Sequence, residues 1–406
     1  MVNFMIKPAS FNCNIGCKYC FYLEKQDFMS VDDYHSGKHM DIYKAKQFIE
    51  KRIKEEKGKD IYFTWQGGEP LLAGLDFYKT VVEIQEALGA VYGKRIHNAV
   101  QTNGILITEK WAEFLKEKKF LVGISIDGDE ALHNVYRKTV NGGATFDKVM
   151  RGLKNLQKKG VEFNTLTVVN DKNVKYPLEV YRFLKSIGSR FMQFIPVIET
   201  LDTDENYKPK WIDDKDFVPR KTGFSVNPLE YGKFMSAVFD EWISKDVSQV
   251  SIRMFDSLLA RFAGYEQTLC VFKEECGGNN LALEADGTVY QCDHFVYPES
   301  KFKIGNIKEM SLAEIEEKSK KLSDVKKDIS RKCQECEWLE LCHGGCPKHR
   351  FVNSGDTQEK ISYFCEGYKY IFEHITPGLN LILEFKNKQI PWKYLPAAVE
   401  EMNKRK

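Results

Sequence analysis

The first 200 residues alternate short runs of apolar, β-branched and aromatic residues with longer segments in which apolar residues recur every three or four positions. The short runs predict six strands, at residues 4–8, 61–65, 96–101, 121–126, 163–169 and 191–197. The longer segments predict helices near residues 41–57, 75–89, 109–118, 145–159 and 176–187. Thr108 and Thr145 are suited to begin two of these helices, and Gly160 and Gly188 fall where two would end.

Strands that alternate with helices in this way predict a parallel sheet with right-handed crossovers. The fold class is therefore α/β, and ligands are expected at the carboxyl ends of the strands. The pattern changes at residues 199–228, which are polar and aperiodic and include Asp202, Asp204 and Glu205. A loop of this length either forms a solvated surface or acts as a lid whose acidic residues bind a basic side chain of the substrate.

The rest of the chain predicts a second domain. An amphipathic helix runs from Pro228 to about residue 245, and another lies near 253–264. A β-hairpin that turns on Asp286 and Gly287 follows. We expect three regions: residues 1–228, with a linker at 199–228, then 229–386, and a charged C-terminal tail at 387–406.

The composition is that of an ordinary globular protein, with 406 residues, 43% hydrophobic and 29% charged, and a net charge of +2. This charge gives no reason to expect nucleic acid or an acidic membrane surface as a partner. The sequence has no apolar run of about 18 residues and does not open with a basic segment followed by a long apolar one. We therefore expect a cytoplasmic protein without a membrane span.

The eleven cysteines form two groups along the sequence, three at positions 13–20 and eight between 270 and 365. Because the cytoplasm is reducing, metal binding is a better use for them than disulfide bonds. Cys13, Cys17 and Cys20 are three thiols without a close fourth. Three thiolates would leave one iron of a [4Fe–4S] cluster open to a ligand that is not protein. The alternative is a partial zinc site, although structural zinc needs four ligands.

The Cys-x3-Cys-x2-Cys spacing, with Tyr19 before the last cysteine, resembles the signature of the radical S-adenosylmethionine (SAM) enzymes. The resemblance implies an open parallel (β/α)6 partial barrel, with SAM bound to the open iron and cleaved reductively to a 5′-deoxyadenosyl radical. Further motifs follow the strands, namely Gln66-Gly67-Gly68-Glu69-Pro70 and Gln101-Thr102-Asn103-Gly104.

The same resemblance implies roles for individual residues. Gly67, Gly68 and Glu69 match the Gly-Gly-Glu motif that holds the amino group of SAM. Ser125 and Arg137 are candidates for the SAM ribose and carboxylate, because guanidinium pairs well with a carboxylate. The sixth strand, with Ile195, would pack near the adenine. His133 is expected to be structural, and Arg137 has the alternative of a plain surface arginine.

The C-terminal cysteines include the run Cys333-x2-Cys336-x5-Cys342-x3-Cys346. Eight thiols make two sets of four, which would suit two zinc ions as well as two iron–sulfur clusters. The run resembles the SPASM-type auxiliary-cluster domain, so the C-terminal part would be a cysteine-rich, cluster-binding domain of a β-hairpin and helices. The resemblance implies one [4Fe–4S] cluster on Cys270, Cys276, Cys292 and Cys346. It implies a second on Cys333, Cys336, Cys342 and Cys365, and thus three clusters in total.

Within this group the chain looks most like the anaerobic sulfatase-maturating enzymes. The resemblance rests on Ile6-Lys7-Pro8-Ala9-Ser10, Cys20-Phe21-Tyr22, the two strand-end motifs and Cys292-Asp293. It implies oxidation of a sulfatase Cys or Ser to Cα-formylglycine, with a reducing donor such as flavodoxin or ferredoxin and a monomeric enzyme. Asp293 would be the catalytic base, with a pKa raised by its apolar site. Tyr22 and Gln66 are further candidates for positioning the substrate.

Two other interpretations remain open at this point. SPASM-type enzymes also form thioether or carbon–carbon crosslinks in ribosomal peptides, and many carry an extra N-terminal peptide-binding module. The first predicted strand begins at residue 4, which favours a protein substrate here. A non-catalytic zinc scaffold or electron carrier would explain the C-terminal cysteines, but would leave the three-cysteine motif and Gly67-Gly68-Glu69 without a purpose.

Overall fold

The computed structural model describes residues 3–23, 25, 39–200, 219–276, 280–297, 301–355 and 359–404. Its central feature is a ten-stranded sheet in the order β10-β9-β8-β1-β2-β3-β4-β5-β6-β7. The first seven strands along the chain are β1 (Phe4–Ile6), β2 (Asp60–Trp65), β3 (Arg95–Thr102), β4 (Leu121–Ser125), β5 (Phe163–Val169), β6 (Phe191–Pro196) and β7 (Ser251–Ile252). These seven pair in parallel in chain order. The expected α/β fold with a parallel (β/α)6 partial barrel is confirmed.

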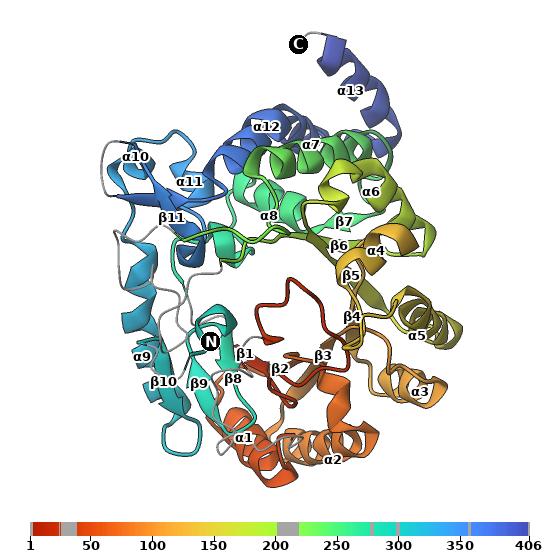
Figure 1. The fold of residues 1–406 in the computed structure, drawn as a ribbon, viewed down its shortest axis with the longest axis vertical. Helices are drawn as coiled ribbons and strands as arrows, with labels where there is room; N and C mark the ends of the chain where they lie inside the picture. The colour runs from red at the N-terminus through yellow and green to blue at the C-terminus, as the bar shows by residue number, and fades with distance from the viewer. Residues whose placement is uncertain are drawn as a thin grey trace.

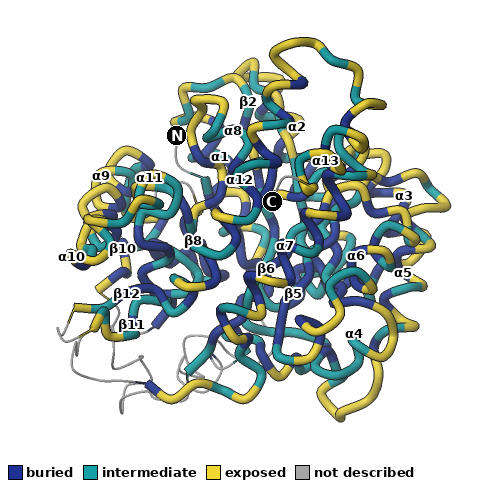
Figure 2. Tube along the Cα trace, turned by 90° about the horizontal axis from the view of Figure 1, so that it is seen from above, coloured by how far each residue is buried: buried dark blue, intermediate teal, exposed yellow. Residues whose placement is uncertain are grey.

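Helices follow the barrel strands and cover the outer face of the curved sheet (Figure 1). They are α1 (Ile42–Glu55), α2 (Leu75–Tyr92), α3 (Glu109–Glu117), α4 (Glu130–Tyr136), α5 (Phe146–Lys159) and α6 (Pro177–Ser186), with 3-10 turns η2 (Pro70–Ala73) and η3 (Asn173–Lys175). Their apolar sides join the strands in one buried core, as the dark interior of Figure 2 shows. The strongly polar outer sides are what gave these segments a helical period in the sequence.

The helix starts predicted at Thr108 and Thr145 and the helix end predicted at Gly160 agree with the structure. Thr108 accepts a hydrogen bond from the backbone N–H of Trp111, and Gly160 ends α5 in the left-handed conformation. Helix α5 also begins at the predicted residue, with Thr145 at its N-cap position, although the Thr145 side chain makes no capping hydrogen bond. Its hydroxyl instead donates to the carbonyl oxygen of Arg137 at 2.6 Å. The short helix α4 was not predicted from the sequence.

A hairpin from the C-terminal half extends the barrel sheet beyond β1. The strands are β8 (Leu281–Leu283), β9 (Thr288–Tyr290) and β10 (Lys303–Asn306). Strand β8 lies parallel to β1, with Ile6 opposite Leu283, and the backbone N–H of Lys7 donates to the Leu283 carbonyl at 2.8 Å. The predicted hairpin turn, with Gly287 at φ +95°, is confirmed. This pairing brings the residues after β9 to the mouth of the barrel.

The remaining C-terminal elements pack beside the barrel (Figure 1). They are α7 (Pro228–Lys245), α8 (Arg253–Phe262), η5 (Cys270–Phe272), η6 (Asp293–Phe295), α9 (Leu312–Leu322), η7 (Ser323–Lys326), α10 (Arg331–Gln334), α11 (Leu339–Cys342), η8 (Pro347–His349), β11 (Arg350–Asn353), β12 (Lys360–Ser362), α12 (Cys365–Asn387), η9 (Trp392–Tyr394) and α13 (Leu395–Lys404). Helices α7 and α12 approach closely at Gly367, where a Cβ atom would lie 2.0 Å from the Pro228 carbonyl oxygen.

Two parts of the chain complete the comparison with the sequence. The charged segment expected at 387–406 contains helix α13, and Leu395 and Val399 are buried. The acidic residues Asp202, Asp204 and Glu205, expected in a substrate lid, lie outside the described residues. Within the described part of the chain, no helix has the length and apolar character needed to cross a membrane.

Candidate active site and cysteine clusters

A cavity of about 330 Å³ lies at the carboxyl ends of the barrel strands. It brings together residues from three distant parts of the sequence: the loop after β1, the ends of the barrel strands, and η6. The predicted site residues on its wall are Cys13, Cys17, Tyr19, Cys20, Tyr22, Gln66, Gly67, Gly68, Ser125, Arg137, Ile195 and Asp293. Glu69 is the one predicted barrel residue that does not line it.

The three-cysteine loop is fixed by backbone hydrogen bonds on both sides. The N–H of Gly16 donates to the Lys138 carbonyl at 2.8 Å, in the segment after α4. On the other side, the N–H of Gly68 donates to the Ser10 carbonyl at 2.7 Å. A Cβ atom at position 68 would lie 2.0 Å from the carbonyl oxygen of Asn12, so only glycine allows this approach. The Gly-Gly turn is therefore a close backbone contact with the cysteine loop.

Burial raises the pKa of Cys13 and of Cys17 to about 12, and it also raises the pKa of Cys20. The neighbouring thiols add to the shift of Cys13. Three buried thiols would therefore keep their protons unless a cation replaced them. A metal centre supplies that positive charge, and thiolates are its preferred soft ligands.

Glu69 lies behind the cavity wall, fully buried. Its carboxylate accepts hydrogen bonds from the Leu71 N–H at 3.0 Å, the Thr102 hydroxyl at 2.8 Å and the Asn103 N–H at 2.8 Å. Burial raises its pKa to about 7, against the effect of these bonds. Glu69 thus links the turn after β2 to the end of β3. Of the Gly-Gly-Glu motif, only the backbone of Gly67 and Gly68 lines the cavity.

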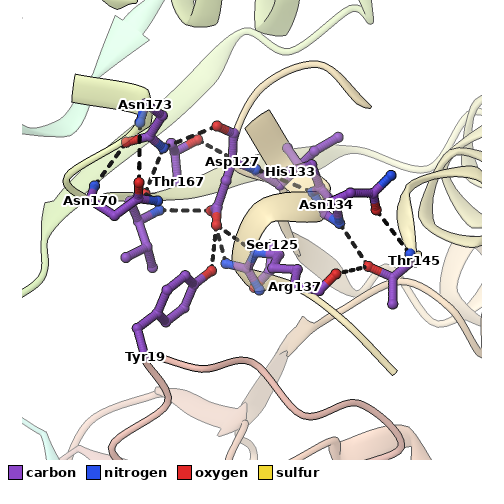
Figure 3. A network of polar contacts seen from close by, with 12 residues as sticks. Tyr19, Ser125, Asp127, His133, Asn134, Arg137, Thr145, Thr167, Asn170 and Asn173 are labelled. Atoms are coloured by element: carbon purple, nitrogen blue, oxygen red, sulfur yellow. Dashed lines mark hydrogen bonds and ion pairs between the residues drawn. The ribbon is translucent and has the colours of Figure 1, made fainter. Parts of the chain in front are cut away.

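Arg137 is held by a carboxylate that the sequence reasoning missed (Figure 3). Its Nε lies 3.0 Å from Oδ2 of Asp127, and both side chains are buried. The Tyr19 hydroxyl donates to the same carboxylate, and the guanidinium lies 5.5 Å from the Tyr19 ring centre. Burial alone would lower the pKa of Arg137, but Asp127 raises it, so the arginine stays charged. A carboxylate directly after a barrel strand was the signal in the sequence.

His133 is a structural residue, as expected. Its Nδ1 accepts the backbone N–H of Asp127 at 3.4 Å, and its Nε2 lies 3.1 Å from the Thr145 hydroxyl oxygen. Since that hydroxyl donates to the Arg137 carbonyl, Nε2 is the donor to Thr145. Burial lowers the pKa of His133 to about 4, and Arg137 acts in the same direction. The neutral imidazole therefore holds the Asp127 turn in place.

Ser125 is oriented by Gln101 from the neighbouring strand. The Gln101 Nε2 donates to the Ser125 hydroxyl at 3.1 Å, and both residues line the cavity. Gln101 lies over Gly123, where a Cβ atom would come within 2.0 Å of its Oε1. The absence of a side chain at position 123 makes room for this amide.

Asp293 lies on η6 at the opposite side of the cavity, with Oδ2 at 3.3 Å from Nζ of Lys7. Burial acts to raise the pKa of Asp293, but the charges of Lys7 and His294 and the hydrogen bonds from Cys292 and Lys7 together outweigh it, and the pKa is lowered. The expectation of a raised pKa is therefore wrong, because it did not include the lysine. Lys7 follows β1 and is almost completely buried. The carboxylate is ionised and able to accept a proton.

Tyr22 extends this side of the site through a second buried carboxylate. Its hydroxyl donates to Glu284, which also accepts a hydrogen bond from the Ser10 hydroxyl at 2.7 Å. The Lys7 ammonium lies 4.6 Å from the Tyr22 ring centre. Glu284 directly follows β8, so the pairing of β1 with β8 aligns it with Lys7. Glu284 could not be predicted as a site residue from the sequence, because its contacts depend on that pairing.

Three further wall residues were not predicted individually as site residues. His294, His349 and Glu199 line the cavity. Lys348 donates to Glu199 at 2.6 Å and lies 3.3 Å from Nδ1 of His294. This contact joins the end of β6 to the cysteine-rich region and closes the cavity opposite the barrel.

The C-terminal cysteines gather in the two expected sets. Cys333, Cys336, Cys342 and Cys365 all line one small cavity of about 30 Å³. In the other set, burial raises the pKa of Cys270, and the thiol of Cys346 adds to this shift. Cys346 acts in the same way on Cys276, whose pKa is about 12. Burial likewise raises the pKa of Cys292, with contributions from the thiols of its own set.

All eleven cysteines are free thiols. Across the described residues, no three His, Cys, Asp or Glu side chains converge closely enough to hold a single metal ion. A tetrahedral zinc site requires that convergence. A four-iron cluster binds one thiolate at each iron and spreads its ligands around a larger volume. The three sets of cysteines provide the thiolate donors that such clusters require.

Comparison with known proteins gives a consistent result. Residues 8–184 match the family described as the radical SAM superfamily, and residues 270–346 match an iron-sulfur cluster-binding domain, SPASM. The chain is 37% identical to the serine-type anaerobic sulfatase-maturating enzyme of Bacteroides thetaiotaomicron, over 97% of this chain and 94% of the relative. It is 36% identical to the cysteine-type enzyme of Clostridium perfringens, over 93% and 97%.

A solved structure is similar over nearly the whole chain. It is described as native anSMEcpe with bound AdoMet and Cp18Cys peptide, with a TM-score of 0.80 and 33% identity over 94% of this chain and 98% of that one. Streptococcus suis SuiB bound to S-adenosylmethionine has a TM-score of 0.57 at 15% identity, which is a likeness of fold.

Proposed function

The chain belongs to the anaerobic sulfatase-maturating enzymes of the radical SAM superfamily, and we propose that it oxidises a Cys or Ser of a sulfatase to Cα-formylglycine. The observation that carries the proposal is the single cavity in which the three-cysteine loop faces Asp293. One side can hold the radical-generating cofactors, and the other offers a carboxylate beside Cys292. The two sides thus meet two requirements of the reaction, which are removal of a hydrogen atom and removal of a proton.

The cofactors are three [4Fe–4S] clusters and SAM. When bound, they supply the radical that removes a hydrogen atom from the substrate Cβ and the acceptor for the remaining electron. Cys13, Cys17 and Cys20 would hold the cluster with the open iron. The two auxiliary clusters would take the sets Cys270, Cys276, Cys292, Cys346 and Cys333, Cys336, Cys342, Cys365. Their proximity within each set supports this assignment.

The barrel residues bind and orient SAM in this proposal. The backbone of Gly67 and Gly68 faces the amino group, with Glu69 bracing the turn from behind. Ser125 faces the ribose and Arg137 the carboxylate, with Tyr19 and Asp127 fixing the guanidinium. Ile195 provides an apolar surface for the adenine.

Asp293 takes the proton of the substrate thiol or hydroxyl. Lys7 keeps the carboxylate ionised and points it into the cavity. Tyr22 and Gln66 line the same side and position the substrate side chain. With Ser, loss of the Cβ hydrogen atom, the hydroxyl proton and one further electron gives the aldehyde directly, whereas with Cys the same losses give a thioaldehyde that must still be hydrolysed.

The partner of the enzyme is a sulfatase polypeptide. We propose that the electrons for SAM cleavage come from a small reducing protein such as flavodoxin or ferredoxin, and that the enzyme acts as a cytoplasmic monomer on neither nucleic acid nor membranes. The net charge of +2 supports the last point. The regions 1–228, 229–386 and 387–406 are proposed as its units, although β8 to β10 share the barrel sheet.

The test is mass spectrometry of anaerobic incubations with SAM, reductant and two peptides that carry a sulfatase-type motif with Cys or Ser at the target position. We expect an aldehyde on at least one peptide together with an equal amount of 5′-deoxyadenosine, and the reactive peptide defines the substrate type. The Asp293→Asn variant should still cleave SAM and form no aldehyde. SAM cleavage with a crosslinked peptide would favour the peptide-crosslinking alternative instead.

A further inference from the structure

Lys326 is a buried lysine in the cysteine-rich region, with 2% of its surface exposed. Its Nζ donates to the carbonyl oxygens of Val271 at 2.8 Å and Gly345 at 2.6 Å. Val271 directly follows Cys270, and Gly345 directly precedes Cys346. The ammonium therefore joins the two segments that carry half of the first auxiliary set.

Arg350 occupies the neighbouring position and is bonded in a similar way. Its guanidinium donates to the carbonyls of His343 at 3.0 Å, Gly344 at 2.9 Å and Gly345 at 3.3 Å. These three residues form the link between Cys342 of the second set and Cys346 of the first. The same guanidinium also donates to the Lys326 carbonyl at 3.0 Å. Arg350 thus lies against the peptide that separates the two sets.

The link itself is shaped so that its carbonyls can reach these cations. His343, Gly344 and Gly345 all have positive φ, at 46°, 71° and 67°. A Cβ atom at Gly344 would lie 2.9 Å from a guanidinium nitrogen of Arg350. Three consecutive left-handed residues are costly outside glycine. The strain at His343 and the close packing at Gly344 indicate that the contact with Arg350 is tightly specified.

Neither cation has a carboxylate partner within ion-pair distance among the described residues. All their bonds go to neutral carbonyl groups. Burying a charge without an opposite charge is strongly unfavourable. Burial lowers the pKa of Lys326, and the charge of Arg350 adds to this, whereas the thiols of the neighbouring cysteines, Cys346 first among them, act to raise it. A cluster with four thiolates carries net negative charge, so it is the missing counter-ion.

We propose that Lys326 and Arg350 are positioning residues for electron transfer, whose buried positive charge stabilises the reduced auxiliary clusters and raises their reduction potentials. Lys326 mainly stabilises the reduced form of the cluster on Cys270, Cys276, Cys292 and Cys346. Arg350 lies between the two auxiliary clusters and stabilises the reduced form of both. The proposal rests on the proposed function in that it requires both clusters. A positive charge favours the state with one more electron, and net charge is a known determinant of cluster potential.

This arrangement suits the direction of electron flow. Cys292 of the first set precedes Asp293, and its Sγ lies 3.4 Å from Oδ1 of that residue. The first auxiliary cluster is therefore beside the cavity and takes the electron that the substrate loses. Lowering its potential would make that step less favourable. Neutralising Lys326 should then reduce the formylglycine formed per SAM cleaved.

The experiment is an anaerobic redox titration of the reconstituted holoenzyme, followed by electron paramagnetic resonance and paired with iron analysis. Full-length chains with Cys13, Cys17 and Cys20 changed to Ala identify the auxiliary signals. The neutral variants are Lys326→Met and Arg350→Met, and Lys326→Arg and Arg350→Lys keep the charge. Lys327→Met is the matched control, because Lys327 is half exposed and pairs with Asp324 at 3.3 Å.

We expect the neutral variants to shift an auxiliary midpoint potential downward, while the charge-keeping variants and Lys327→Met match the parent. Loss of iron from the auxiliary clusters of the neutral variants, but not of the charge-keeping variants, would also support the role of Lys326 and Arg350 as positive counter-charges to the clusters. Unchanged potentials at full iron content would overturn the proposal, as would equal iron loss in neutral and charge-keeping variants. A parent enzyme that holds its clusters but forms no formylglycine would reject the proposed function only.

Discussion

Nζ of Lys7 lies 3.3 Å from Oδ2 of Asp293, although the two residues are 286 positions apart in the sequence. The contact exists because β1 pairs in parallel with β8, which places the cysteine-rich region against the first barrel strand. A carboxylate that must accept a proton is thereby held ionised at one wall of the cavity, across from the three-cysteine loop.

Replacing Lys7 by Met should leave Asp293 without its partner and turn the carboxylate from its position. We expect formylglycine formation to fall by about 10- to 100-fold, a typical cost for losing an outer partner of a site residue. SAM cleavage should continue, since the Lys7 ammonium is bonded to Asp293 and, among the described residues, has no hydrogen bond to Cys13, Cys17 or Cys20. Lys7→Arg should recover part of the activity. The measurement is aldehyde formed per 5′-deoxyadenosine.

The control for this prediction is Lys79→Met, on the exposed side of α2, where Lys79 pairs only with Asp76 at 3.4 Å. If Lys7→Met and the parent enzyme formed the same amount of aldehyde per 5′-deoxyadenosine, the function of Asp293 would not depend on Lys7.

Gly68→Ala should disrupt the close backbone contact that holds the three-cysteine loop in place. The new Cβ would lie 2.0 Å from the Asn12 carbonyl oxygen, and backbone cannot move aside as a flexible side chain can. We expect reconstituted iron to fall from about twelve to about eight atoms per chain, the content of two clusters. SAM cleavage should be lost with it.

Gly223→Ala is the matched control, because a Cβ atom there meets nothing within 4 Å. Iron analysis and the visible spectrum measure the outcome. A Gly68→Ala enzyme with full iron content and normal SAM cleavage would show that the close approach at Asn12 is not required.

The features that the sequence predicted well are those that local pattern determines. The six barrel strands could be predicted from apolar runs such as Phe163–Val169. The division of the cysteines into groups could be predicted from their spacing along the chain. The role of Asp127 could also have been inferred, since it directly follows the strand predicted at residues 121–126. Glu284 and Lys7 could not, because their contacts depend on how two distant strands pair. The wrong pKa direction for Asp293 has the same origin.

Glu199 and Lys348 should be energetically coupled, because their ion pair of 2.6 Å is mostly buried at the junction of β6 and η8. Removing one partner leaves the other charge buried, so we expect Lys348→Met or Glu199→Gln to cost about 2 to 5 kcal/mol. The double variant should cost less than the sum of the two. Urea denaturation of the cluster-loaded enzyme without oxygen, followed by circular dichroism, measures the cycle.

The exposed pair Lys79 and Asp76 provides the comparison, with an expected coupling of about 0 to 1 kcal/mol. Additive costs for Lys348→Met and Glu199→Gln would mean that the junction is held by packing alone and that this ion pair contributes nothing of its own.

His133 should make the stability of the protein depend on pH. Its pKa is lowered from 6.5 to about 4 in the folded state, because the ring is buried and lies near the positive charge of Arg137. Below pH 6.5 the unfolded chain takes up a proton that the folded chain does not, so acid favours unfolding. The loss approaches about 1.4 kcal/mol per pH unit until the folded-state pKa is reached.

The free energy of unfolding of the parent enzyme, measured by urea denaturation between pH 8 and pH 5, should therefore fall as the solution becomes more acidic. His133→Gln should lose part of that dependence, since a glutamine can donate to Thr145 without taking up a proton. His374→Gln, at a half-exposed position that contacts Asp240 at 2.8 Å, is the control. An unchanged pH profile in His133→Gln would assign the acid sensitivity to other groups. A reduced slope would identify the imidazole that holds the Asp127 turn, and with it the Arg137 side of the cavity, as an acid-sensitive part of the site.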